Sequence, residues 1–149
     1  MNTKRQPYHL IFYVLCIVVL SHSLVSCKKD DPDPEEEKLK ELAASWRIDS
    51  VTNDNQDVTS QYTGFVLSVE GTKTYSTVNG GNPWPVQGTF DFVNGNFDLI
   101  RRDDGVDITI ANLTPTTLSL TFNITSVRGT ANGAQGITGA FTFNLSKTN

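Results

Sequence analysis

Histidine and cysteine are scarce in this chain and are confined to its start. The 149 residues include two histidines, His9 and His22, and two cysteines, Cys16 and Cys27. Beyond Cys27 there is no imidazole and no thiol, which excludes Ser-His-Asp and Cys-His catalysis in that part of the chain. The same absence excludes disulfides there, and the zinc and copper sites that depend on His and Cys ligands. Residues 28–149 must therefore be stabilised by their core alone.

Basic residues are the second shortage. Residues 27–149 hold 10 of the 12 basic residues and all 16 acidic ones, so their net charge is −6. This balance argues against nucleic acid as a partner and against electrostatic adhesion to anionic lipid. The sequence also singles out no pair of carboxylates for glycoside hydrolysis. We expect no enzymatic activity, no metal and no cofactor, and we expect a monomer.

The first 26 residues have the three parts of a secretory signal peptide. Lys4 and Arg5 form a charged beginning, an apolar run of 11 residues follows at 10–20, and small residues lead up to position 26. Such a run is too short for a membrane-spanning helix, which needs about 20 residues, but it is typical of a signal peptide. The alternative is an uncleaved single-pass anchor that extends to Val25, against which His22 and the neighbouring serines argue.

Cys27 ends the run Leu24-Val25-Ser26-Cys27, which resembles the lipobox of bacterial lipoproteins. The resemblance implies that this cysteine becomes the first residue of the mature protein and receives a diacylglyceryl group and a further acyl chain. Stable anchoring takes more than one lipid chain, because a single acyl chain binds a membrane only marginally. We therefore expect the membrane to be a partner through this anchor.

Residues 27–37 are expected to form a disordered acidic tether. The stretch is charged, contains proline and has no apolar residue after the cysteine, so it cannot bury surface. Lys28 and Lys29, followed by acidic residues, resemble the export signal of surface lipoproteins of the Bacteroidota. That resemblance implies the outer membrane and exposure at the cell surface, and a generic spacer facing the periplasm is the alternative.

A short helix is predicted at residues 35–44. Asp33 is a suitable N-cap, Pro34 suits the first turn, and the glutamates that follow complement the positive end of the helix dipole. Leu39 and Leu42 lie three positions apart and begin an apolar stripe, which must pack against another part of the chain.

From Trp46 onward the sequence shows no second helical period, and strand signals recur about every ten residues. Eight strands are predicted, near residues 45–52, 64–70, 73–78, 87–93, 96–102, 105–112, 116–126 and 139–146. Apolar and polar residues alternate in them, so one face of the sheet is apolar. With no helix left to cover that face, the sheet must close on itself. The predicted fold is all-β: an antiparallel up-and-down β-barrel of about eight strands over residues 38–149, with the short helix capping one mouth.

Two turns set the predicted register. Asn94-Gly95 is the strongest short signal for a two-residue hairpin. The inner side chains of that hairpin would be Phe90, Phe92, Phe97 and Leu99. Asp104-Gly105, as a second two-residue turn, would pair Arg101 with Ile108 inside the barrel. It would leave Arg102 on the outer face, opposite Asp107.

Acidic residues gather around that second turn. Asp103, Asp104 and Asp107 flank Gly105, and a hard cation such as calcium accepts oxygen ligands of this kind. The spacing lacks the Asp-x-Asp-x-Asp-Gly loop and its later glutamate. We therefore expect a solvated hairpin tip rather than a metal site.

Several short segments resemble the lipocalin-like domains of Bacteroidota lipoproteins, within the wider calycin barrels. The resemblance covers about residues 39–149 and rests on the helix before Trp46, on Asp57-Val58-Thr59 with Tyr62 and Phe65, on Trp84-Pro85 with Gly88-Thr89-Phe90, and on Leu113-Thr114-Pro115-Thr116-Thr117-Leu118. Lipocalins begin their first strand with Gly-x-Trp, whose Trp closes the barrel floor. Here the Trp is Trp46, but the Gly position holds Ala44. The resemblance implies the fold and the binding of a small hydrophobic or amphipathic ligand.

Arg101 is the main candidate for ligand contact. An inward guanidinium at the lumen mouth needs a partner and would anchor a carboxylate. The alternative is a strand-end arginine whose charge reaches solvent. The other candidates are the lumen and rim aromatics Phe90, Phe92, Phe97, Tyr75 and Trp84. Trp84, held between two prolines, would either stack on a sugar or partner, or fold over a barrel mouth as a plug.

The width of the barrel leaves two functions open. A barrel of about eight strands is just wide enough to be filled by its own side chains or to hold one small ligand. With a usable cavity the protein would carry a small hydrophobic or amphipathic molecule. With a filled core it would be a non-enzymatic surface module that contacts a protein or a glycan through its exterior.

Overall fold

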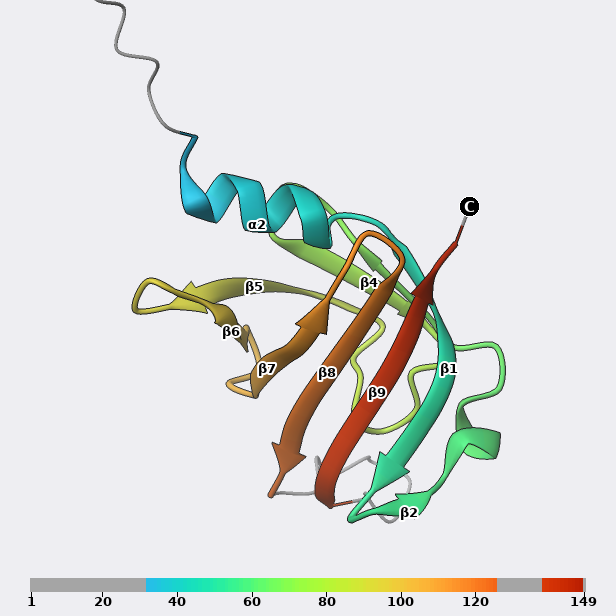
Figure 1. Ribbon diagram of the computed structural model, residues 1–149. Coiled ribbons are helices and arrows are strands. Elements are labelled where there is room, and N and C mark those ends of the chain that lie inside the picture. The colour runs from blue at the N-terminus through green and yellow to red at the C-terminus, as the bar shows by residue number, and fades with distance from the viewer. Residues whose placement is uncertain (1–31, 126–137, 149) are drawn as a thin grey trace, which may run out of the picture. The chain divides into compact units, whose positions relative to one another are not determined.

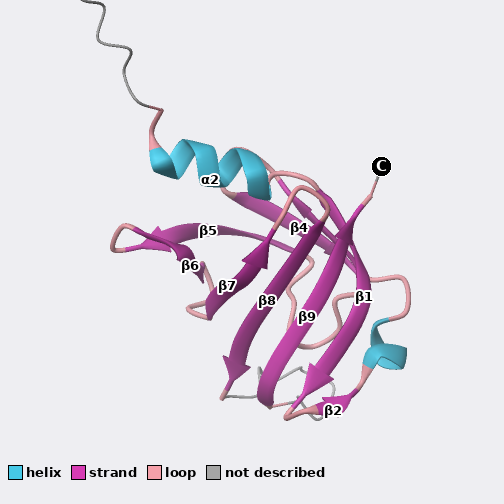
Figure 2. Ribbon diagram, viewed as in Figure 1, coloured by secondary structure: helices cyan, strands magenta, loops and turns pink. Residues whose placement is uncertain are grey.

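The computed structural model describes residues 32–125 and 138–148. The predicted signal peptide, Cys27 and residues 28–31 of the predicted tether lie outside the described residues. The prediction of a disordered tether is wrong for residues 34–37, because they form the first turn of an α-helix. The described chain is mostly β, with one short α-helix and a closed barrel of eight antiparallel strands (Figure 2). The predicted all-β, up-and-down barrel is therefore confirmed.

The elements follow the predicted order, and their ends lie within two residues of the predicted ones. They are α2 (Pro34–Leu42), β1 (Ser45–Asn53), β2 (Gln56–Asp57), the 3-10 turn η1 (Thr59–Tyr62), β3 (Val66–Val69), β4 (Thr74–Val78), β5 (Gln87–Val93), β6 (Asn96–Arg102), β7 (Asp107–Leu113), β8 (Thr117–Ile124) and β9 (Gly139–Lys147). The two-residue β2 and η1 were not predicted.

Pairing between the first and last strands closes the barrel. Strands β3 to β9 pair in chain order, and β1 pairs with both β3 and β9. The β1–β9 register runs from Trp46 opposite Lys147 to Asn53 opposite Phe141. In Figure 1, β7, β8, β9 and β1 run side by side, and α2 lies across one end of the barrel. β2 pairs only with β1, so it adds a short flap outside the closed ring.

Helix α2 forms and docks as its sequence predicts. Asp33 is its N-cap and accepts a hydrogen bond from the Glu35 amide at 2.9 Å. Leu42 is buried in the core and Leu39 packs against it. Trp46 is fully buried, and its indole nitrogen donates to the Leu42 carbonyl at 3.0 Å. Trp46 therefore ties the end of the helix to the first strand, at the mouth that the helix covers.

The hairpin of β5 and β6 has a different register from the predicted one. Val93 pairs with Asn96, as a two-residue turn at Asn94-Gly95 requires, but Phe92 pairs with Ile100. Three residues of β6 are therefore unmatched, which makes an enlarged β-bulge. Side chains along a strand alternate between the two faces of the sheet. A shift of the register by an odd number of residues, here three, therefore moves every later residue of β6 to the other face.

The prediction that Arg101 and Leu99 face inward is consequently wrong. Arg101 pairs with Asp91 and Asp107 on the outer face, and Leu99 is opposite Thr109, which is exposed. The inward residues of this strand are buried and are Ile100 and Arg102.

The turn between β6 and β7 explains how Arg102 remains inside. The Gly105 amide donates to the Arg102 carbonyl at 2.9 Å, and the Arg102 amide donates to the Val106 carbonyl at 3.0 Å. The loop therefore has three residues, 103–105, and not the two predicted. Gly105 has a φ of 85°, the left-handed conformation that a three-residue hairpin needs at this point. The predicted pairs of Arg101 with Ile108 and of Arg102 with Asp107 are wrong for this reason.

Aromatic side chains fill most of the barrel. The buried rings are Trp46, Tyr62, Phe65, Tyr75, Trp84, Phe90, Phe122, Phe141 and Phe143. Tyr62 meets Phe143 edge-on at 5.0 Å between centroids, and Phe122 stacks on Phe141 at 5.5 Å. Such pairs stabilise a core by about 0.5–1.5 kcal/mol beyond the area they bury. Tyr62 and Phe65 come from η1 and the segment after it, so parts of the chain outside the barrel strands complete the core.

Tyr62 gives the barrel a predictable response to alkali. Its side chain is buried, and its hydroxyl has no hydrogen-bond partner among residues 32–125 and 138–148. Burial raises the pKa of this phenol above its ordinary value of 10.0. The folded protein therefore holds the proton more tightly than the unfolded chain does, and this contribution to stability is complete below about pH 10 and is lost as the pH rises through the folded pKa.

We expect Tyr62→Phe to keep or raise the stability at pH 8, because it removes a buried polar group without a partner. The variant should also lose less stability than the parent chain between pH 9 and 11. Urea unfolding midpoints across that range check both points, and an equal alkaline decline in the two proteins would contradict the second.

Candidate functional site

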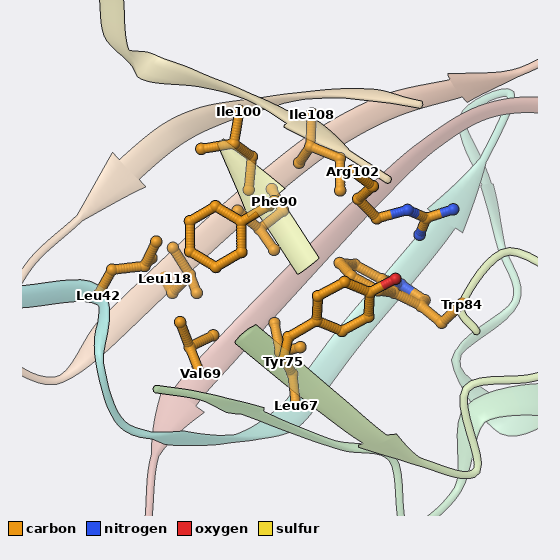
Figure 3. A pocket seen from close by; sticks show the side chains of 11 residues that line it. Leu42, Leu67, Val69, Tyr75, Trp84, Phe90, Ile100, Arg102, Ile108 and Leu118 are labelled. Atoms are coloured by element: carbon orange, nitrogen blue, oxygen red, sulfur yellow. The ribbon is translucent and has the colours of Figure 1, made fainter. Parts of the chain in front are cut away.

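The space left inside the barrel is small. The volume open to the centre of a water molecule is about 20 Å³, which holds about one or two waters. In Figure 3, Leu42, Val69, Phe90 and Leu118 lie on one side of this space, and Tyr75, Trp84 and Arg102 lie on the other. Pockets that hold small-molecule ligands have volumes of about 300–1,000 Å³. In the part of the chain that the structure describes, the lumen is therefore almost filled by the protein's own side chains.

Trp84 is the largest of these side chains to come from a loop. The segment between β4 and β5 places its ring 5.4 Å from Phe122 and 6.0 Å from Tyr75, edge-on to both. Gly80 allows the loop to turn tightly, because a Cβ there would lie 2.7 Å from the Trp84 Cβ and 2.8 Å from the Thr77 hydroxyl. Trp84 is 4% exposed. The prediction that it plugs the barrel is therefore correct, and the alternative of an exposed stacking platform is wrong.

Among the strands that the structure describes, Arg102 is the only basic residue whose side chain points into the barrel. The carboxylate of Asp104 neutralises its charge. Its guanidinium donates to the Asp104 carboxylate at 2.6 and 3.1 Å and to the Pro83 carbonyl at 2.8 Å. It also lies 5.0 Å from the centre of the Trp84 ring. The Asp104 carboxylate further accepts the Val106 amide at 3.2 Å. The predicted solvated tip is wrong for Asp104, because its side chain is only 5% exposed.

The buried guanidinium of Arg102 links two loops of the barrel. Asp104 belongs to the β6–β7 turn, and Pro83 and Trp84 belong to the β4–β5 loop, so Arg102 binds both. A buried ion pair gains little by itself, because removing two charges from water costs several kcal/mol. Loss of one partner is far more costly, since the remaining charge is then buried alone. We assign Arg102 the role of a structural clamp that holds the Trp84 plug in place.

Sequence reasoning missed Arg102, although two signals pointed to it. Leu99 and Ile100 are consecutive apolar residues, which breaks the alternation of a regular strand and is typical of a bulge. The three residues 103–105 also suit a hairpin loop that ends in a glycine. Together these signals place Ile100 and Arg102 on one face.

Arg101 lies outside the barrel and is paired there. Its guanidinium donates to the two Asp107 carboxylate oxygens at 2.6 and 2.8 Å, and its side chain is 56% exposed. The hydrogen bonds and the opposite charge raise the pKa of Arg101 and lower the pKa of Asp107. Arg101 is therefore in a surface ion pair and does not reach the lumen.

The other predicted contact residues divide into two groups. Phe90, Tyr75 and Trp84 line the lumen, as predicted. Phe92 and Phe97 are half-buried at the edge of the core and pack on each other, with 5.5 Å between ring centroids. They do not line the lumen.

The larger concave space lies outside the barrel. A cleft of about 510 Å³ lies between α2 and the turn that joins β7 to β8. Glu37, Lys40, Glu41 and Lys147 line it with charges of both signs, and Leu113 and Pro115 supply apolar surface. Among residues 32–125 and 138–148, this cleft offers space of ligand size, whereas the space inside the barrel does not.

Two further features of the described residues bear on the function. Within residues 32–125 and 138–148, no three His, Cys, Asp or Glu side chains are placed to hold a metal ion together. In the same residues, no helix has the length and apolar character needed to cross a membrane.

Comparisons with known proteins give no relative. No protein-family model matches the chain. No curated protein matches it, and no solved structure does either.

Arg102 and Arg101 form a matched pair for testing the clamp. Arg102→Met would bury the Asp104 carboxylate without its cation, so we expect the free energy of unfolding to fall by about 3–5 kcal/mol. Arg101→Met removes only a solvent-exposed ion pair and should leave the free energy of unfolding almost unchanged. Urea unfolding of both variants measures the difference.

The double variant Arg102→Met, Asp104→Asn supplies the control. It removes the orphaned charge, so it should regain part of the stability that Arg102→Met loses. Equal losses for the Arg101 and Arg102 variants would show that the clamp contributes nothing.

Proposed function

We propose that this protein is a lipid-anchored, non-enzymatic interaction module of the bacterial cell envelope. In this proposal the barrel is a filled scaffold, and partners contact its exterior. The observation that carries the proposal is the lumen volume of about 20 Å³, which is far below the size of a small-molecule pocket.

The charge inside the barrel supports the same conclusion. A carrier of amphipathic acids needs a cation that is available to the ligand, and the inward Arg102 already binds Asp104 and Pro83. Residues 28–149 contain no histidine and no cysteine, which supports a non-enzymatic role.

Two features near the N-terminus bear on the location of the protein. The lipobox-like run that ends at Cys27 supports a lipid anchor, and the basic pair followed by acidic residues supports the outer membrane and its external face. The segments quoted above, together with the closed barrel, support membership of the lipocalin-like lipoproteins as part of this proposal.

A second candidate function is the carriage of a small hydrophobic or amphipathic ligand. One observation favours it: Trp84 comes from a loop, and its indole N–H has no acceptor among the described residues. A ligand that displaced this loop would enter an apolar lumen with Arg102 beside it.

Native mass spectrometry of the protein from its producing cells separates the two functions. We expect the mass of the lipidated chain alone, and no displacement of a fluorescent fatty-acid analogue. The variant Trp84→Ala opens the filled lumen and is expected to bind indole, which shows that the assay detects a cavity when one exists. A stoichiometric small molecule on the parent protein would instead support the carrier.

Two cysteine variants test the anchor. Cys27→Ser removes the proposed lipid attachment, so the protein should move from the membrane fraction to the soluble fraction when cells are broken and centrifuged. Cys16 lies in the proposed signal peptide, so Cys16→Ser should leave membrane attachment unchanged. Retention of the Cys27→Ser protein in the membrane would contradict lipidation at this residue.

A further inference from the structure

An asparagine followed by a glycine occurs at Asn79-Gly80, Asn94-Gly95 and Asn132-Gly133. In such a pair the glycine nitrogen can approach the side-chain carbonyl of the asparagine closely, because the glycine has no Cβ to obstruct it. The third pair lies outside the described residues. The structure gives the first two pairs opposite surroundings, and this difference bears on their reactivity.

Asn94 and Gly95 are both exposed at the tip of the β5–β6 hairpin, which lies at the left of Figure 1. Among residues 32–125 and 138–148, no group forms a hydrogen bond with the Asn94 side chain. A Cβ built on Gly95 would meet no atom within 4 Å. The side-chain amide and the glycine nitrogen beside it are therefore free of protein contacts that would keep them apart.

Few backbone pairs hold this tip. β5 forms ladder pairs with β4 only up to Thr89, and β6 forms them with β7 only from Leu99 onward. Within the hairpin, Val93 and Asn96 make the one ladder pair between the turn and the enlarged bulge. A segment with so few supporting contacts opens locally at little cost in free energy.

Side-chain contacts beside the turn do not change this conclusion. Lys73 pairs with Asp91, and Lys38 pairs with Asp98, but the two carboxylates are 75% and 65% exposed. Exposed ion pairs of this kind add little stability. The turn can therefore leave its left-handed backbone conformation, with φ of 52° at Asn94, and bring the glycine nitrogen to the side-chain carbonyl.

Asn79-Gly80 is held in place. The side-chain nitrogen of Asn79 donates to the backbone carbonyls of Thr63 and Gly64, both at 3.3 Å. Gly80 is buried, and a Cβ on it would lie 2.7 Å from the Cβ of Trp84. Attack at Asn79 would therefore require two hydrogen bonds to break and the loop to leave the barrel mouth.

We propose that Asn94 is a site of spontaneous deamidation and that the fold protects Asn79. In the first step the Gly95 nitrogen forms a bond to Cγ of Asn94, and the bond from Cγ to Nδ2 breaks. The proton of the Gly95 nitrogen leaves with Nδ2 as ammonia. Water then opens the cyclic imide at either carbonyl, which gives aspartate or isoaspartate. This modification is independent of the proposed function.

Both products add one negative charge to the hairpin tip. Aspartate is compatible with the turn, because Asp-Gly favours the same two-residue hairpin as Asn-Gly. Isoaspartate places an extra methylene carbon in the backbone, so the turn no longer fits the pairing of Val93 with Asn96. The modification therefore changes both the charge and the shape of an exposed part of the barrel.

Peptide mapping of the purified full-length protein tests the proposal. The folded protein is incubated in a mildly alkaline buffer, because base removes the proton from the attacking nitrogen. Mass spectrometry of the digested protein then measures the acid product at each Asn-Gly pair separately. Each hydrogen bond that protects Asn79 is worth about 0.5–1.5 kcal/mol, so we expect Asn94 to react at least roughly tenfold faster than Asn79.

Two controls show whether the fold causes the difference. In guanidinium chloride both pairs lose their surroundings, so Asn79 and Asn94 should react at similar rates. The variant Trp84→Ala removes the plug on which Gly80 packs, so it should speed the reaction at Asn79 and leave the rate at Asn94 unchanged.

The proposal is overturned if the folded protein gives no acid product at Asn94, or if Asn79 reacts as fast as Asn94. It is also overturned if the difference persists in guanidinium chloride, because the local sequence would then be its cause. None of these results bears on the mass and dye measurements of the lumen, so failure here leaves the proposed function standing.

Discussion

Pairing of β1 with β9 is the constraint on which the rest of this structure depends. The inner face of the sheet is mostly apolar, and the one α-helix in the described chain is far too short to cover it. Closure of the ring lets the sheet cover itself and leaves no long free edge. It also brings the polar residues of β7, β8, β9 and β1 onto a single outer face.

The interior illustrates how a narrow barrel is completed. The strands alone would leave space at the mouth away from the helix, and the chain fills it with Tyr62, Phe65 and Trp84 from the connecting segments. Holding Trp84 there uses a buried charge, because Arg102 binds the carbonyl beside it and the carboxylate of the next turn. An arginine, a residue type that suggests ligand recognition in a sequence, is thus bound here by the protein's own groups.

The fold was predictable from the sequence because its signals are local and repeated. Alternation of apolar and polar residues, turn residues and the N-cap at Asp33 placed the helix and all eight barrel strands. The candidate site was predictable only in part. Trp84 was correctly assigned as a plug, but Arg101 was assigned to the lumen in place of its neighbour Arg102.

That error has a simple physical origin. A strand's side chains alternate with a period of two, so one unforeseen bulge or one extra loop residue exchanges inside and outside. Both occur here, at the unmatched residues of β6 and at the three-residue loop before Val106. The sequence signals for both are weaker than the Asn94-Gly95 and Asp104-Gly105 pairs, which favour regular two-residue turns.

The closing pair of strands also bears on how the chain reaches its native state. The other barrel pairs from β3 to β9 join neighbours in sequence, whereas β1 and β9 bring together residues roughly 90 to 100 positions apart. Contacts between distant residues form slowly, because the entropy of a long loop is lost before the contact stabilises anything. We therefore expect the hairpins to assemble first and the final seam to be the slow step, during which the edges of the first and last strands stay open to other chains.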